Sequence, residues 1–164
     1  MAAEIRLNGL PRKLVQDGVL DEETTIKALH AALKQKVSFI RYLVENKVLP
    51  ADKLAMEASL EFGLPVVDLE AIDPESMPKD IVDDKLIQKH HAMPLYKRGN
   101  RLFVGLSDPM NSAAIDDIKF QTGLNTEAVL VEENKLSALI EKLQEEQDSA
   151  MDDMMDDDME NLDD

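Results

Sequence analysis

The hydrophobic pattern of this chain changes at Gly63, and that change limits the fold more than any other feature. Before it, apolar residues recur every three or four positions, which is typical of helices that cover a core with one face. After it, short β-forming runs such as LFVGL alternate with helical segments and turn residues. The sequence therefore predicts an α+β protein, in which an N-terminal helical subdomain packs on a small three- to four-stranded α/β subdomain.

Residues 1–63 carry the start and stop signals of several helices. Pro11 suits a first turn, Asp21 is a favourable N-cap before Glu22 and Glu23, and Pro50 can open a helix that Gly63 closes. The predicted core stripe consists of Leu14, Val15, Ile26, Leu29, Leu33, Ile40, Leu43, Val44, Leu54 and Ala58.

A faint internal repeat runs through this helical half. LVQDGVL from Leu14 resembles LVENKVL from Leu43, at a spacing of 29 residues. Two copies are too few for a solenoid, so we expect two related helical hairpins that pack together.

The second half predicts strands that alternate with helices. Residues 64–78 form a connecting segment with a short β run at 66–69, and residues 79–144 form the α/β subdomain. Within it we expect helices at 79–90, 112–121 and 132–146 and a strand at 127–131. The run MPLYKRGNRLFVGL reads as a hairpin that turns at Arg98-Gly99-Asn100. We expect the helices to cover one face of the sheet.

Most of the net charge of −16 lies at the C-terminal end. Residues 145–164 hold 11 acidic residues and no Lys or Arg, and few branched or aromatic side chains. Such a block predicts a disordered acidic tail or linker; the alternative is a Met-studded motif that folds onto a partner. Without a basic stripe, nucleic acid is disfavoured as a partner. The absence of cysteine and of a long apolar run favours a cytoplasmic protein with no direct membrane insertion.

No catalytic motif accompanies this pattern. The chain lacks the Walker string Gly-x-x-x-x-Gly-Lys and the dinucleotide fingerprint G-x-G-x-x-G, so we expect no enzyme activity from it. His90 and His91 point about 100 degrees apart on a helix and have no third ligand at a suitable spacing, which argues against a metal site. Asp116 and Asp117 are expected on a solvated helix face, and Asp108 in a turn.

The order of these segments resembles a known family. LVQDGVL, LVENKVLPADKL, EFGLPVVDL, LFVGLSDPMN and FQTGLNTEAVLV occur here in the order and spacing of the N-terminal (MshEN or GspE-N-like) domain of type IV pilus assembly ATPases of the PilB family and their type II secretion relatives. The resemblance covers the chain from about Leu10 to Leu143. It implies that catalysis, with ATP and Mg, belongs to a separate C-terminal domain, and that this chain is a regulatory and docking module of a hexameric motor. Its partners would be the rest of the hexamer and the inner-membrane pilus machinery.

Several members of this family bind cyclic di-GMP through paired motifs of the form RLGxxLVxxGxIxxxxLxxALxxQ, in which Arg, Gly and Gln contact the ligand. Here the motif is degenerate: Leu14, Val15, Gly18, Leu43 and Val44 match it. In the first copy, the Arg-Leu-Gly positions hold Gly9, Leu10 and Pro11, and the Gln position holds Ala32. In the second, they hold Ser38, Phe39 and Ile40, with Lys47 at the Gly and Glu61 at the Gln.

An arginine contact to guanine or phosphate contributes on the order of 1.5 to 3 kcal/mol, and no substitute restores it at these positions. We therefore expect no cofactor in this chain. A direct cyclic di-GMP receptor remains the alternative function, because a shift of register by one or two residues would bring in Arg6, Arg12 or Arg41.

Protein recognition is the function that these losses leave. In a helix over residues 37–48, the apolar arc spans about 180 degrees, which is wider than a one-sided core stripe requires. Two neighbouring helices could cover this arc. The alternative is a partner face around Phe39, Ile40, Tyr42 and Leu43, because aromatic residues commonly anchor interfaces. The resemblance suggests a PilZ-type adaptor protein of the same pili as the partner.

Overall fold

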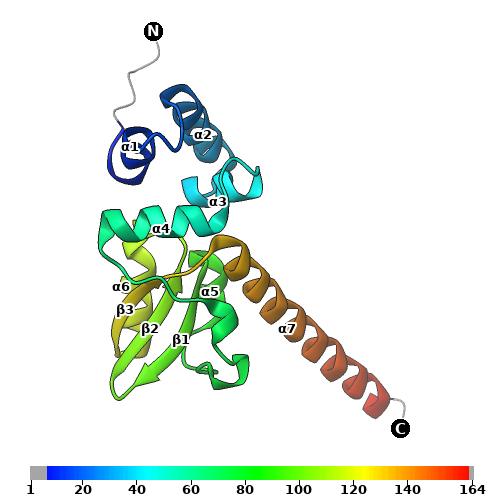
Figure 1. Cartoon of the computed structure of the whole chain (residues 1–164). Helices are drawn as coiled ribbons and strands as arrows, with labels where there is room; N and C mark the ends of the chain where they lie inside the picture. Colours follow the sequence, from blue (N-terminus) through cyan, green and yellow to red (C-terminus); the bar gives the residue numbers. More distant parts are fainter. Residues whose placement is uncertain (1–6, 163–164) are drawn as a thin grey trace.

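The computed structural model describes residues 7–162, with four helices in the N-terminal subdomain (Figure 1). They are α1 (Gly9–Gln16), α2 (Glu22–Gln35), α3 (Phe39–Glu45) and α4 (Ala51–Phe62). The Asp21 carboxylate accepts a hydrogen bond from the Thr24 amide at 2.8 Å and so caps α2, and Gly63 ends α4 with a φ of 70°. The sequence signals for these helix ends are therefore confirmed.

The buried face of α2 differs from the predicted stripe. The helix turns Thr25, Ala28 and Ala32 inward. Small side chains let α2 approach α3 closely, and they leave Ile26 and Leu29 only half-buried. Leu33 is 76% exposed, so its placement in the core stripe was wrong.

The second subdomain is built on a three-stranded sheet in the order β1-β2-β3. Strands β1 (Ala92–Arg98) and β2 (Arg101–Leu106) form the antiparallel hairpin predicted at Gly99, whose φ is 60°. After β2, helix α6 (Ser112–Thr122) leads to β3 (Asn125–Leu130), which pairs with β2 in parallel. Helix α5 (Asp84–His90) precedes the sheet and α7 (Glu133–Leu162) follows it.

Both faces of β2 are buried toward its end, so the expectation of helices on one face was wrong. Leu102, Val104 and Leu106 point to one face, while Gly105 and Ser107 are buried on the other. A Cβ atom at Gly105 would lie 3.0 Å from Leu95 Cδ1 and 3.2 Å from Val131 Cγ1. Glycine is therefore required where the neighbouring chain approaches this closely.

Two other elements depart from the predicted boundaries. Helix α5 starts at Asp84 rather than at residue 79, because Asp80 takes a left-handed backbone with a φ of 62° and Asp83 caps the helix. Residues 66–69 form only a single bridge between Val66 and Leu130, followed by the 3-10 helices η1 (Leu69–Ala71) and η2 (Pro74–Ser76).

Leu130 joins the two subdomains. Its side chain is fully buried in the core of the helical subdomain, while its backbone belongs to β3. The Leu130 carbonyl accepts a hydrogen bond from the Val67 amide, and its amide donates to the Pro65 carbonyl, both at 2.8 Å. The connecting segment is therefore tied to the sheet at the point where the two cores meet.

Helix α7 continues as far as Leu162, through most of the segment predicted as a disordered tail. Gln147, which donates a hydrogen bond to Asp84 in α5, is the only half-buried side chain among residues 145–152. The others are exposed, and the helix projects away from the body of the molecule (Figure 1). The segment thus lies outside the core, as its composition predicts, but its backbone is helical in the part that the structure describes.

Candidate functional site

The internal repeat forms two helix ends of the same geometry. At the end of α1, the Gly18 amide donates to the Val15 carbonyl at 3.1 Å and the Val19 amide to the Leu14 carbonyl at 2.9 Å. At the end of α3, the Lys47 amide donates to Val44 at 3.1 Å and the Val48 amide to Leu43 at 2.8 Å. In both copies an apolar residue after the turn packs back onto the helix, which is a common way to end a helix.

The residues that match the cyclic dinucleotide motif serve this scaffold. Leu14 and Leu43 are fully buried in the helical core, and Val15 and Val44 are half-buried. Gly18 takes a φ of 70°, which explains a glycine at the turn without any ligand.

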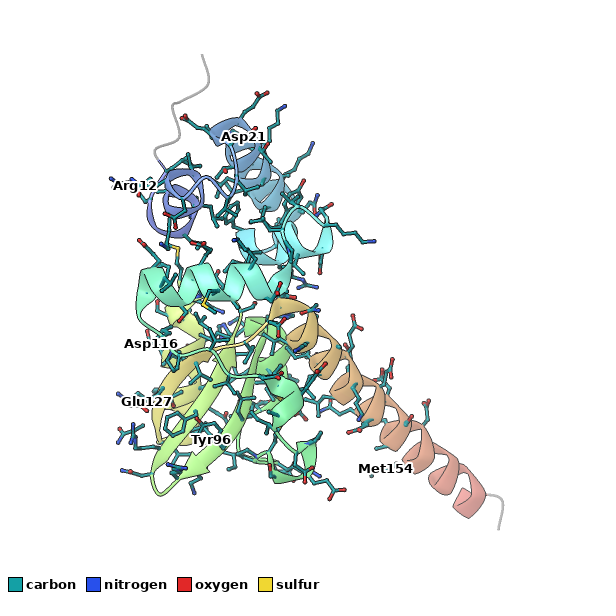
Figure 2. All side chains as sticks on the ribbon, viewed as in Figure 1. Arg12, Asp21, Tyr96, Asp116, Glu127 and Met154 are labelled. Atoms are coloured by element: carbon teal, nitrogen blue, oxygen red, sulfur yellow. The ribbon has the colours of Figure 1, made fainter. Side chains whose placement is uncertain are left out.

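Most positions where the family motif places its ligand-binding groups hold packing residues or caps in this chain, while Lys47 and Glu61 are exposed. Leu10 and Pro11 are buried, and a Cβ atom at Gly9 would lie 3.6 Å from the Phe62 ring. Ser38 accepts a hydrogen bond from the Arg41 amide at 3.1 Å and caps α3, and Ala32 is buried. Arg41 pairs with Glu45 in its own helix at 2.7 Å. Arg12 is exposed (Figure 2), while Arg6 lies outside the described residues.

The turn at Gly18 is bordered by carboxylates. Lys13 Nζ lies 2.9 Å from Asp17 Oδ2 and 3.7 Å from Glu57 Oε2, and its hydrogen bond lowers the pKa of Asp17. Glu57 is buried, and its Oε2 atom has no hydrogen-bond donor among the residues that the structure describes. Glu61 adds its charge to the field around Lys13. Lys13, with Lys53 acting on Asp17, therefore faces three carboxylates, so negative charge exceeds positive charge at this turn and disfavours an anionic ligand.

The predicted partner residues divide into two kinds. Ile40 and Leu43 are core residues, whereas Phe39 and Tyr42 are half-buried and keep some surface for a contact. Leu33, in the last turn of α2, is largely exposed, and α2 lies against α3. We call Leu33, Phe39 and Tyr42 the α2–α3 face. No finding tests these residues as partner contacts, so they stay a prediction.

A buried polar cluster lies where α5, β2 and α7 meet, and the sequence did not indicate it. Glu133 is 2% exposed; its Oε1 lies 2.6 Å from His91 Nε2 and accepts a hydrogen bond from Ser107 Oγ at 2.9 Å. Ser137 binds the other carboxylate oxygen and lies 3.1 Å from the same His91 nitrogen. Burial alone would raise the pKa of Glu133, but the hydrogen bonds from His91 and the two serines outweigh it and lower the pKa.

This cluster is not built for catalysis. In a catalytic relay, one ring nitrogen of the histidine takes the proton of the nucleophile, and the other ring nitrogen donates a hydrogen bond to the carboxylate that orients the ring. Here Ser137 and Glu133 both approach Nε2 of His91, and Ser107 is buried. The cluster therefore fixes the position of α7 against the end of β2.

The other candidate polar residues are placed locally. His90 Nε2 lies 2.7 Å from Asp117 Oδ2, away from the partners of His91, and the described residues contain no group of three side chains that could hold a metal ion. Burial raises the pKa of Asp108, which accepts a hydrogen bond from the Met110 amide at 3.0 Å and shapes the turn before α6. Asp116 is exposed (Figure 2). Within the described residues, no helix combines the length and apolar character needed to cross a membrane.

Residues 62–150 match the family model of the MshEN domain. The type IV pilus assembly ATPase PilB of Pseudomonas aeruginosa is 44% identical over 163 residues, which are 99% of this chain and 29% of PilB. PilB of Acinetobacter baylyi is 39% identical over 135 residues, 82% of this chain and 23% of its own length. The chain thus spans less than a third of each of these two relatives.

Two solved structures share the fold. One is MshE with cdg, at 22% identity and a TM-score of 0.62, with 84% of this chain and 99% of that one aligned. The other is the N-terminal domain of XpsE, at 20% identity and a TM-score of 0.65, with 84% and 97% aligned. Family model, relatives and fold agree: this chain belongs to the MshEN domain family and corresponds to the N-terminal domain of PilB-type pilus assembly ATPases.

Proposed function

We propose that this chain is the non-catalytic regulatory and docking domain of a type IV pilus extension ATPase and that it acts through protein contacts. Its similarity to part of PilB supports this role. The sequence contains no Walker string, so ATP and Mg would bind in a separate catalytic domain. The domain would work on the cytoplasmic side of the inner membrane, within the hexamer and the pilus machinery, and so contribute to twitching motility.

The observation that carries the proposal is that, within the helical subdomain, the motif positions are unsuited to a nucleotide while the α2–α3 face is suited to a protein. Most positions where the family motif places ligand groups hold packing residues or a helix cap, and three carboxylates surround Lys13 at the Gly18 turn. The α2–α3 face exposes Leu33 at 76%. A surface with exposed apolar groups suits a protein partner, while clustered carboxylates disfavour a dianionic nucleotide. We propose a PilZ-type adaptor as that partner, bound at the α2–α3 face.

The second candidate is a direct cyclic di-GMP receptor that controls the motor. Its support is the fold shared with MshE, whose structure contains cdg. In this chain, the exposed Arg12 is the described cation that a shifted binding register could recruit most directly.

Calorimetric titration of the chain with cyclic di-GMP and, separately, with a purified PilZ-type adaptor tests both. We expect heat from the adaptor and none from the nucleotide. The variants Leu33→Asp and Tyr42→Ala should weaken adaptor binding, whereas Phe120→Ser, on an exposed residue of the α/β subdomain, should leave it unchanged. If the chain binds cyclic di-GMP and Arg12→Ala abolishes that binding, the chain is a direct receptor instead of a docking domain. If the adaptor fails to bind, the docking proposal is overturned.

A further inference from the structure

The hairpin end of the sheet is a concentration of positive charge on an acidic protein. Lys97, Arg98 and Arg101 fall within five residues around the Gly99 turn, and all three are exposed. Arg101 pairs with Glu127 at 2.6 Å, whereas Lys97 and Arg98 form no ion pair with any residue of the described part of the chain. Two cations therefore extend into solvent at this end.

Aromatic residues lie at the same end of the sheet. Tyr96 and Phe103 stack across the hairpin with ring centroids 4.6 Å apart, and the Arg101 guanidinium lies 5.2 Å from the Phe103 centroid. Phe120 is in the last turn of α6, which leads into β3, and the first residue of β3 pairs with Arg101. Its side chain is 92% exposed. A ring this exposed contributes little to the core of its own chain and is available for a contact, and aromatic residues commonly anchor interfaces.

The projecting part of α7 carries the opposite chemistry. Met151 and Met154 are 63% and 69% exposed, and residues 145–164 hold 11 acidic residues without a Lys or Arg. Figure 2 shows Met154 on the projecting helix, far from Tyr96 and Glu127 at the hairpin end. The described part of this helix therefore does not reach the hairpin of its own chain.

We infer that the acidic end of α7 in one copy of this chain binds the hairpin end of another copy. Aspartates would pair with Lys97 and Arg98, and exposed methionines would pack on Phe120, since methionine sulfur makes favourable contacts with aromatic rings. Both properties of the hairpin end, its charge and its exposed ring, thus have a counterpart in the same segment.

Such a contact is head to tail. Each copy offers one hairpin end and one acidic helix, so that both remain available after a first contact, and repetition leads to a ring or a filament. This self-association goes beyond the docking role proposed above and does not depend on an adaptor.

The contact is mainly electrostatic, so salt should weaken it. Glu127 on the neighbouring strand is engaged with Arg101, and Lys97 and Arg98 have no ion-pair partner among the described residues. Charges on exposed side chains are screened over about 10 Å at 0.1 M salt and over about 3 Å at 1 M.

Sedimentation velocity of the full chain over a range of concentrations tests the inference. We expect association at about 0.02 M salt and a monomer at about 1 M. Two variants should stay monomeric in both buffers: K97E/R98E, which reverses the hairpin charge, and a variant in which Asp152, Asp153, Asp156, Asp157 and Asp158 become asparagine. The control K34E/K47E makes the same charge change on exposed lysines of the helical subdomain and should associate as the wild type does.

Mixing the two variants gives the sharpest readout. The first retains an intact acidic helix and the second an intact hairpin, so together they should form a one-to-one complex and nothing larger. Phe120→Ser should weaken wild-type association about two- to tenfold, the range expected for the loss of one methionine–aromatic contact. A wild type that is monomeric at low salt overturns the inference, and so does association that survives both variants. If the wild type does not self-associate but binds anionic lipid vesicles, and K97E/R98E abolishes that binding, the hairpin end would be assigned to a membrane instead.

Discussion

Lys47 takes the same left-handed backbone conformation as Gly18, 29 residues earlier, at the end of the second copy of the repeat. Their φ angles are 55° and 70°, and the hydrogen bonds around them match. Glycine adopts this conformation at no steric cost, whereas a residue with a Cβ atom pays about 1 kcal/mol.

Lys47→Gly should therefore raise the free energy of unfolding, by up to about 1 kcal/mol after the extra chain entropy of glycine is subtracted. Gly18→Ala should lower it by about 1 kcal/mol. Urea denaturation measures both. As a matched control, Lys53→Gly on the exposed face of α4 should destabilise the protein by about 1 kcal/mol, because its backbone is helical. A loss of stability in Lys47→Gly equal to that of Lys53→Gly would contradict the strain at Lys47.

The close approach at Gly105 predicts that even one methyl group is costly. Gly105→Ala places a Cβ atom 3.0 Å from Leu95 Cδ1, and we expect a loss of about 1 to 3 kcal/mol in the free energy of unfolding. The combination with Leu95→Ala should cost less than the sum of the two single changes, because the second substitution removes the atoms that the new methyl meets. Strict additivity in this double-mutant cycle would argue against the contact.

The buried cluster around Glu133 predicts a pH dependence of stability. The pKa of Glu133 is lower in the folded chain than its usual value of about 4.3, so its contribution is fully present above that pH and is lost as the pH falls through the folded pKa. Between pH 5 and pH 3 the wild type should lose more stability than Glu133→Gln, which has no carboxylate to protonate at this position. Chemical denaturation at each pH gives the comparison.

The same cluster gives a ranking of variants at pH 7. Glu133→Ala leaves His91 and two serines without their shared acceptor and should cost about 3 to 5 kcal/mol. Ser107→Ala removes one donor and should cost about 1 kcal/mol. If the two variants unfold at the same denaturant concentration, Glu133 is not the centre of this network.

The parts of the fold that short segments specify could be predicted from the sequence. The Gly99 turn, the Asp21 cap and the glycine end at Gly63 depend on backbone preferences within a few residues, and the structure has all of them. The repeat predicted two related helical hairpins, which stays a prediction; the structure shows matching hydrogen bonds at the two helix ends, around Gly18 and Lys47.

The features that depend on distant partners could not be read from the sequence. Glu133 lies 26 residues from Ser107 and still further from His91, and nothing in their local pattern indicates that they meet. The orientation of α2 was mispredicted because hydrophobicity favours Leu33 as a core residue, while the close approach to α3 selects the smaller Ala28 and Ala32. Ile40 and Leu43 were predicted both in the core stripe and on the candidate partner face, and their burial agrees with the core stripe.

Leu130 predicts how the two subdomains depend on each other. Its side chain fills the helical core from a strand of the sheet, so Leu130→Ala should lower the free energy of unfolding by about 2 to 5 kcal/mol and should also loosen the link between the two cores. Hydrogen exchange would report this: amides of α1 and α3 should lose more protection than those of β1 and β2, because the α/β subdomain keeps its own core residues at Val104 and Ile118. The matched variant Val104→Ala, within the core of the α/β subdomain, should reverse the order. Equal loss of protection in both subdomains for both variants would mean that the chain opens as one unit, and that Leu130 is an ordinary core residue rather than the joint between two cores.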